Sequence, residues 1–356
     1  MKKWFPFLLM VFISARVCGQ SDLERYLSTH YYSFSPGNGP GPALSDTLVR
    51  KLRSYRVILQ AEGGSHYLSL YNDLSLMWLR FLNRQLGVTH FFFEFGHSAD
   101  LLCNAGLANG DSSYWFFARR TMWNDLYTYN RSRPEKNRLH PIGIDFESRR
   151  TYVKALRLLL PGGVPPPQEI GSTLNPVLWG PDTLADCKAQ IHLNAMIKKS
   201  LLLYQSTYKR YLGDGYADFE QIILNPGSCK DVLRNRNQHM AASFLAFDAR
   251  LQDSIYYGEL GQAHTVLNNR NVGSILNQSP GFAGRVCVIN MYCDQCSTPV
   301  EAVSNWTFKK IEPDIQRYFL PLCSSGFTIF DLSDPSPAID RFRAYGQFLI
   351  IARNQQ

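Results

Sequence analysis

Residues 56–73, RVILQAEGGSHYLSLYND, join a short apolar run to a polar turn and then to a helical pattern. The run RVILQ predicts a buried strand. The residues after the turn predict a helix over 67–86, because apolar side chains recur there at intervals of three and four: Leu70, Leu74, Met77, Trp78 and Phe81. Burying an unpaired polar group costs several kcal/mol, so Glu62 and His66 in the turn call for a reason other than packing.

The same alternation of strand and helix signals continues along the chain. Short apolar runs predict buried strands at residues 56–60, 89–93, 139–144, 254–257, 285–289, 327–331 and 347–352. Longer segments with helical spacing lie between them. This order predicts an α/β fold with a mainly parallel central sheet flanked by helices.

Two segments depart from this rhythm. Residues 160–181 contain PGGVPPP and further proline and glycine, which predicts a loop or linker. Residues 183–251 carry no strand signal and predict a helical insertion. We therefore expect residues 20–356 to form a single α/β domain with a helical insertion at about 183–251.

The first 19 residues have the pattern of a secretory signal peptide. Lys2 and Lys3 precede an apolar run over residues 4–13, and small residues follow near Gly19. Cleavage after Gly19 is expected, and a lipid anchor on Cys18 is the alternative. No later apolar run has the roughly 18 residues that a membrane span needs. The sequence thus predicts an exported protein, periplasmic or secreted, without a membrane span.

Charge and cysteine content narrow the class of partner. The formal net charge is +8, without a lysine- and arginine-rich run, so nucleic acid is not an expected partner. Seven cysteines follow Gly19, an odd number that leaves at least one thiol unpaired. Cys293 and Cys296 form a single C-x-x-C pair, for which a structural disulfide, unremarkable thiols and a zinc site all stay open. A zinc ribbon would need a second such pair.

Polar residues follow four of the expected strands. They are Glu62 and His66, Glu94 and His97, Asp145, and Glu259 and His264. In an open α/β sheet, ligands bind beyond the carboxyl ends of the strands. These residues are therefore candidates for chemistry.

Each candidate also has a structural interpretation. Glu62 can complement a helix dipole, His97 can cap a helix and Asp145 can be an N-cap. Glu94 is harder to explain in this way, because it follows a buried run of three phenylalanines and must be paired, protonated or at a cleft. Arg236 shares a helix face with apolar residues, and such an arginine usually meets a carboxylate or an anionic group.

The set of motifs resembles the erythromycin esterase family. The motifs are LQAEGGSHYLSLY, GVTHFFFEFG, the pair Gly143 and Asp145, the pair Arg236 and Met240, His264, and AYGQFLIIA, and together they span about residues 55–352. The resemblance implies that Glu62, His66, Glu94 and His264 form the catalytic centre. It also implies that Arg236 positions the substrate, with Asp145 and His97 as further substrate-binding candidates.

Two differences from the family pattern bear on activity. Glu62 and His66 are four residues apart, whereas the family usually has them closer. The family often has two histidines after the late strand, but residues 261–264 here read GQAH and keep only His264.

The expected function is hydrolysis of an ester, lactone or similar acyl bond by water that Glu and His side chains activate. No G-x-S-x-G motif is present, so a serine nucleophile is not expected. No cofactor is expected, although two Glu and two His could hold a divalent metal, as in a metal-dependent peptidase. The other alternative is an exported binding protein without turnover. The substrate is expected to be a small molecule, with an apolar or ring-bearing part if the aromatic segment 114–129 lines the cleft.

Overall fold

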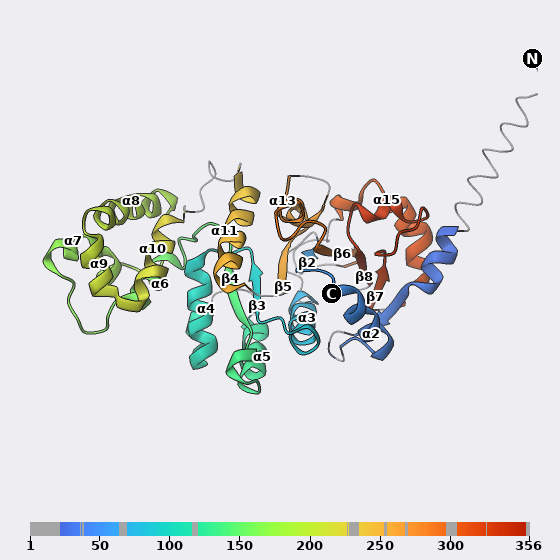
Figure 1. Cartoon of the computed structure of the whole chain (residues 1–356), viewed down its shortest axis with the longest axis horizontal. Helices are drawn as coiled ribbons and strands as arrows, with labels where there is room; N and C mark the ends of the chain where they lie inside the picture. The colour runs from blue at the N-terminus through green and yellow to red at the C-terminus, as the bar shows by residue number, and fades with distance from the viewer. Residues whose placement is uncertain are drawn as a thin grey trace, which may run out of the picture. The chain divides into compact units, whose positions relative to one another are not determined.

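The computed structural model describes residues 22–353 except 36, 38, 64–69, 116–119, 226, 228–234, 253–254, 268–269, 297–304 and 325. The chain divides into two compact units (Figure 1). Unit 1 comprises Met1–Leu86 and Gly258–Gln356, and unit 2 comprises Gly87–Tyr257. The expected signal peptide, residues 1–19, lies outside the described residues.

The strands of unit 1 form a mixed sheet in the order β1-β7-β8-β6-β2. Their bounds are β1 (Tyr31–Phe34), β7 (Gly326–Asp331), β8 (Phe348–Arg353), β6 (Val286–Asp294) and β2 (Val57–Glu62). Both β2 and β8 run parallel to β6. At the other edge, β7 runs antiparallel to β8 and to β1.

The fold is therefore mixed α/β, but its strands are partly antiparallel rather than mainly parallel as the sequence had suggested. The apolar run at residues 327–331 predicts a strand, but it does not indicate whether that strand is parallel or antiparallel to its neighbour. Strand direction depends on the connection before it, and β1, which pairs with β7, is four residues long and carries no apolar run.

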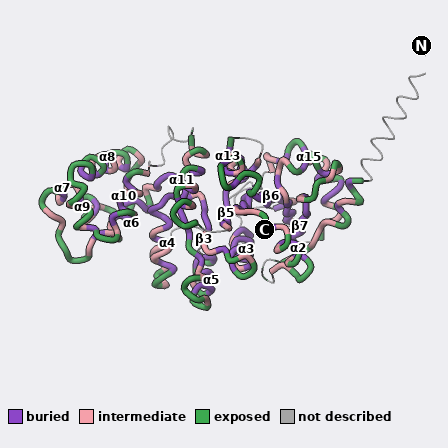
Figure 2. Tube along the Cα trace, viewed as in Figure 1, coloured by how far each residue is buried: buried purple, intermediate pink, exposed green. Residues whose placement is uncertain are grey.

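Burial in unit 1 follows the strands. All six residues of β2 are buried, as are eight of the nine residues of β6, and β6 is drawn mostly in purple in Figure 2. A strand that is buried on both faces has a continuous apolar sequence, and for this reason the sequence predicted both β2 and β6. The helices of unit 1 include residues 22–29, α2 (Pro42–Leu52), α3 (Leu70–Leu86), α12 (Gln262–Thr265), α13 (Val272–Gln278), α14 (Glu312–Asp314) and α15 (Asp340–Arg343).

Unit 2 contains the parallel pair β3 (His90–Phe93) and β4 (His140–Gly143), in a register that pairs His90 with His140 and Phe93 with Gly143. The end of this pair packs tightly. A Cβ atom on Gly143 would lie 2.2 Å from the carbonyl oxygen of Gly96, so only glycine fits there. The remaining strand, β5 (Tyr256–Gly261), begins at the end of unit 2 and continues into unit 1.

Helices make up most of the rest of unit 2. They are α4 (His97–Asn109), α5 (Arg120–Arg131), α6 (Tyr152–Leu159), α7 (Gln168–Trp179), α8 (Cys187–Leu203), α9 (Gln205–Leu212), α10 (Tyr216–Leu224) and α11 (Arg236–Leu251). Residues 183–251 are thus largely helical. The loop expected at 160–181 contains α7, because the proline-rich stretch ends at Pro167, which serves as the N-cap of that helix.

The helices α6 to α10 share one core, to which Tyr152, Ile170, Ile197, Tyr208 and Phe219 contribute fully buried side chains. In the aromatic segment 114–129, Trp123 is buried and its ring lies 6.1 Å from that of Phe93. The described part of this segment therefore packs into the core of unit 2. No helix in the described ranges has both the length and the apolar composition of a membrane span.

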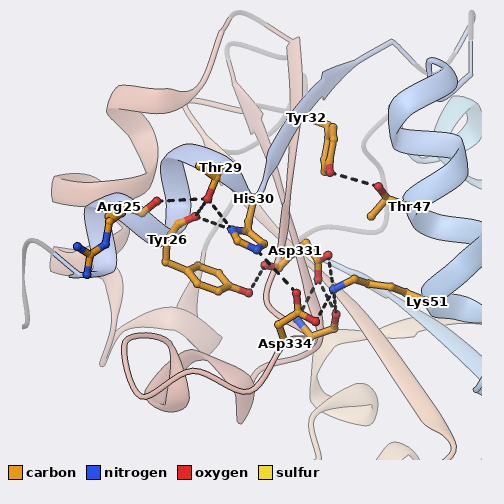
Figure 3. Close-up of polar contacts among 10 residues, drawn as sticks. Arg25, Tyr26, Thr29, His30, Tyr32, Thr47, Lys51, Asp331 and Asp334 are labelled. Atoms are coloured by element: carbon orange, nitrogen blue, oxygen red, sulfur yellow. Dashed lines mark hydrogen bonds and ion pairs between the residues drawn. The ribbon is translucent and has the colours of Figure 1, made fainter.

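An ion-pair network fastens the end of β7 in unit 1 (Figure 3). The Lys51 ammonium lies 2.8 Å from Asp331 Oδ2 and 2.7 Å from Asp334 Oδ1, and it donates to Ser333 Oγ. Tyr26 donates its hydroxyl proton to the Asp331 carbonyl oxygen at 3.0 Å. The Asp331 side chain is only 4% exposed, and Lys51 is the cation that pairs with it.

Replacement of this lysine, Lys51→Met, should loosen the β7 edge of unit 1. The substitution leaves the buried Asp331 carboxylate without its cation, at a cost of about 2–3 kcal/mol. Native-state hydrogen exchange of the β7 and β8 amides measures this cost locally. Lys310→Met, at an exposed lysine of the same unit, is the matched control. Equal protection in the two variants would contradict the role given to Lys51.

Candidate functional site

In unit 2, one guanidinium joins two carboxylates that follow neighbouring strands. Glu94 comes directly after β3, Asp145 comes two residues after β4, and Arg236 is the first residue of α11. Arg236 Nε lies 3.1 Å from each oxygen of Asp145, and Nη2 lies 2.5 Å from Asp145 Oδ2 and 2.9 Å from Glu94 Oε2. The structure therefore brings together three of the residues that the sequence singled out.

This cluster is partly withdrawn from solvent. The side chains of Asp145, Glu94 and Arg236 are 9%, 16% and 26% exposed. Burial alone would lower the pKa of Arg236, but the hydrogen bonds and charges of Asp145 and Glu94 outweigh it, so the pKa is raised. Two carboxylates on one guanidinium leave one formal negative charge at this end of β3 and β4.

A neutral histidine accompanies the cluster. His239 lies one turn after Arg236 on α11, and its ring stacks on Phe146 at 4.4 Å. Burial lowers the pKa of His239, against the opposing effect of Asp145, so the imidazole is neutral at pH 7. Its Nε2 atom is buried without a hydrogen-bond partner in the described part of the chain. His239 falls outside the helix face that carries Arg236 and Met240, so helix periodicity does not mark it as a site residue.

His97 is held in a different way. Its Nδ1 lies 3.0 Å from Asp100 Oδ2, and its Nε2 lies 3.0 Å from Asp218 Oδ1. Burial opposes the charge, but Asp100 and Asp218 outweigh it and raise the pKa of His97 to about 10. His97 is therefore an imidazolium at pH 7, with both ring nitrogens paired. Its expected role in substrate binding stays a prediction.

Glu147 fixes the start of α4 beside this histidine. Its two carboxylate oxygens accept hydrogen bonds from the backbone N–H groups of His97 and Ser98, at 2.9 and 3.0 Å, and Asn225 donates a further one at 2.7 Å. A carboxylate at a helix N-terminus complements the helix dipole. No sequence signal separated Glu147 from the nearby Asp145, since both follow the same strand.

Unit 1 holds the other expected catalytic residues. Glu62 is the last residue of β2 and is 8% exposed, and His264 lies half-buried in α12. His66 lies outside the described residues. The four residues expected to be catalytic are thus divided between the units, with Glu94 in unit 2 and the others in unit 1.

A second buried carboxylate, Glu259, belongs to the part of β5 that lies in unit 1. It is 1% exposed and accepts a hydrogen bond from Ser75 Oγ. Tyr71 donates to the Gly63 carbonyl oxygen at 2.8 Å, and burial, together with neighbouring acidic groups that include Glu62 and Glu259, holds the pKa of Tyr71 well above its usual range. Unit 1 therefore surrounds one neutral phenol with two acidic side chains.

Gln262 is the first residue of α12, two positions before His264. Its side chain is 3% exposed and donates from Nε2 to the Met291 carbonyl oxygen at 2.5 Å. Its Oε1 atom is buried without a partner among the residues described. Gln262 is therefore held by the backbone of β6.

The state of the cysteines bears on the disulfide and zinc alternatives. Cys293 and Cys296 are both buried free thiols, and Cys187 is disulfide-bonded. Within the described ranges, no three His, Cys, Asp or Glu side chains are grouped as a metal site would require.

Comparison with known proteins identifies the fold. No family model matches the chain, and no curated protein matches it in sequence. Among solved structures, a mutant of the erythromycin esterase EreC in its open conformation is similar over 88% of this chain and 94% of its own, with a TM-score of 0.61 and 11% identity. A Bacillus cereus protein (TM-score 0.62, 12% identity) and a succinoglycan biosynthesis protein (0.63, 11%) each match over 94% of this chain and 97% of their own. At this identity the likeness shows the fold alone.

The imidazolium of His97 predicts a pH-dependent stability of unit 2. Its pKa is raised from the ordinary 6.5 to about 10, so its stabilising contribution is complete below pH 6.5 and is lost as the pH rises through 10. We expect wild type to lose on the order of 2 kcal/mol over this range relative to His97→Gln, since the burial of Asp100 offsets part of the gain.

Thermal unfolding midpoints measured from pH 6 to 10 provide the test. His192→Gln, at an exposed histidine of α8, should follow wild type. A parallel pH dependence in wild type and His97→Gln would show that His97 is not charged in the folded protein.

Proposed function

We propose that the protein is an exported hydrolase of an ester, lactone or similar acyl bond, and a divergent member of the erythromycin esterase family. The observation that carries this proposal is the pairing of Arg236 with Glu94 and Asp145 at the ends of β3 and β4. Carboxylates that follow buried strands cost free energy to desolvate, and apolar side chains would pack there at lower cost. Their presence, in a fold shared with an esterase, indicates chemistry at this end of the strands.

In the proposed reaction, a histidine takes a proton from water while the water oxygen attacks the acyl carbon. The proposal assigns this role to His66 or His264, and it assigns the role of the supporting carboxylate to Glu62 or Glu94. The acyl C–O bond then breaks, the histidine returns its proton to the leaving alkoxide, and the products are a carboxylic acid and an alcohol. No co-reactant other than water is needed.

Arg236 supplies a guanidinium for this reaction, within a cluster that carries one formal negative charge. A guanidinium that keeps its charge when half-buried can stabilise the oxyanion that forms on the acyl oxygen. Asp145 holds the guanidinium by its Nε and Nη2 atoms and so fixes its plane. His239, neutral and with an unpartnered ring nitrogen, is a further base that unit 2 offers.

The proposed substrate is a small molecule, which the esterase-like fold supports. Export is proposed from the N-terminal leader pattern of residues 1–19.

A non-catalytic binding protein is the second candidate, and the single histidine in residues 261–264 favours it. The resemblance implies a second histidine at the position of Gly261, and glycine has no side chain that could replace it. A protein that had lost turnover could keep Arg236 to bind an anionic group.

Hydrolysis by the purified mature protein separates the two candidates. The assay uses a panel of esters and lactones, with and without chelator, on wild type, Glu94→Gln and His264→Ala. If the proposal holds, each substitution lowers kcat about 10²–10⁴-fold while the far-UV circular dichroism stays unchanged. Glu169→Gln and His192→Ala, at exposed positions of α7 and α8, should keep wild-type activity.

Two results would contradict the proposal. One is equal turnover in wild type and in both site variants, which would place the hydrolysis at other residues than those proposed. The other is a panel without turnover in which wild type still binds panel members and Arg236→Gln does not, which is the result expected of the binding protein.

A further inference from the structure

Helix α8 carries apolar side chains on two opposite faces. One face packs into the core that α6 to α10 share, and Figure 1 shows α8 along one edge of this group of helices. The other face is exposed, yet it contains Ile191, Leu202 and Leu203, which are 52%, 75% and 66% exposed. A surface helix usually has one apolar face, and a second one marks a surface that meets a partner.

Two lysines lie beside the most exposed leucines. Lys198 precedes Leu202 by four residues and Lys199 precedes Leu203 by four, so these four side chains form one continuous surface, here called the α8 patch. Both lysines are exposed, and neither forms an ion pair with a residue in the described ranges. A lysine stem can lie along apolar groups while its ammonium stays in water. The α8 patch therefore offers apolar area and positive charge together.

The helices around the α8 patch add to its positive charge. The whole of α8 and α9, residues 187–212, contains five cationic side chains and no Asp or Glu: Lys188, Lys198, Lys199, Lys209 and Arg210. The acid of α7 is Glu169, in its first turn. Asp186, the N-cap of α8, lies 16 residues before Leu202, or about 24 Å along the helix.

The acids of α10, which also packs against α8, are already engaged. Asp218 pairs with the His97 imidazolium at 3.0 Å, and Glu220 accepts the hydroxyl proton of Tyr216 at 2.5 Å. Helices α7 to α10 together carry five cations and three acids, and two of these acids have partners of their own. The balance at the α8 patch is therefore positive.

These features decide which kind of partner fits. A second copy, placed by twofold symmetry, would set the lysines of one patch against those of the other, and like charges oppose such pairing. A bilayer that contains anionic lipid matches both features, because its headgroups attract lysine and its acyl boundary accepts leucine. Tyr204, the 39% exposed C-cap of α8, adds an aromatic side chain with a polar tip, which suits the same boundary.

We propose that the α8 patch docks the protein onto the surface of a bilayer that contains anionic phospholipid. Leu202 and Leu203 enter the boundary between headgroups and acyl chains, and the Lys198 and Lys199 ammonium groups meet lipid phosphates. Two leucines provide little apolar area, so the docking is reversible and requires the anionic lipid. This surface goes beyond the proposed hydrolysis and does not depend on it.

Co-sedimentation of the purified mature protein with vesicles tests the proposal. One set of vesicles is phosphatidylcholine alone, and the other contains about 30% phosphatidylglycerol. We expect half of wild type to bind the anionic vesicles at a lipid concentration on the order of 1 mM, and binding to neutral vesicles to be at least about tenfold weaker. Raising the salt from about 50 to 300 mM should weaken the anionic binding.

Two double variants locate the docking surface. Leu202→Gln with Leu203→Gln removes the apolar part and keeps good helix formers, and Lys198→Gln with Lys199→Gln removes the charge. Each should weaken binding to anionic vesicles about tenfold, and the lysine variant should also lose most of the salt dependence. Leu251→Gln and Lys136→Gln, at exposed positions outside α8, are the controls and should bind as wild type does.

The proposal fails if wild type binds neither set of vesicles, or binds both equally. It also fails if both double variants bind like wild type while their far-UV circular dichroism is unchanged, since another surface would then hold the lipid. Sedimentation velocity and titration with poly-L-glutamate identify the other occupants. A dimer that the leucine variant abolishes, or lysine-dependent binding of poly-L-glutamate by a protein that does not bind vesicles, would assign the α8 patch to a second copy or to an acidic polypeptide instead.

Discussion

The ion pairs of Arg236 are the interaction on which the candidate site in unit 2 depends. Glu94 and Asp145 follow strands whose residues are mostly buried, and their carboxylates are themselves largely shielded from solvent. One guanidinium makes three hydrogen bonds to Asp145 and one to Glu94, and so compensates both carboxylates. Without Arg236, the start of α11 would face two like charges.

Unit 1 also contains buried carboxylates, but with other neighbours. Glu62 and Glu259 are both buried, and Tyr71 stays a neutral hydrogen-bond donor to the Gly63 carbonyl oxygen beside them. The Lys51 network, in contrast, lies at the end of β7, which runs antiparallel to β8. Asp331 therefore lies opposite the first residue of β8, at the end of the sheet that is farther from the carboxyl ends of β2, β6 and β8. Its role is to hold the end of β7 in the sheet.

The sequence predicted the strands well where burial on both faces produces an apolar run. The runs at 56–60, 285–289 and 347–352 correspond to β2, β6 and β8. It missed β1, whose four residues YYSF are only partly buried, and it did not predict that β7 is antiparallel. Edge strands and strand direction depend on partners and connections, which an apolar run does not encode.

The candidate site was predictable to the extent that its residues follow strands. Glu94, Asp145 and Arg236 were each found by that rule or by helix periodicity, and the structure joins them. Their neighbours were not predictable, because Asp218 reaches His97 from 121 residues away and His239 is placed by its stacking on Phe146. Contacts of this kind arise only when distant helices pack together.

The central claim is that water attacks the acyl carbon directly. A single-turnover reaction in ¹⁸O-labelled water, on the first ester or lactone that is hydrolysed, tests it by mass spectrometry of product and protein. Direct attack predicts one ¹⁸O atom in the released carboxylic acid and none in the protein. Label in a glutamate side chain of the protein, or an unlabelled acid, would contradict the account, because the acyl group would then have passed through the enzyme.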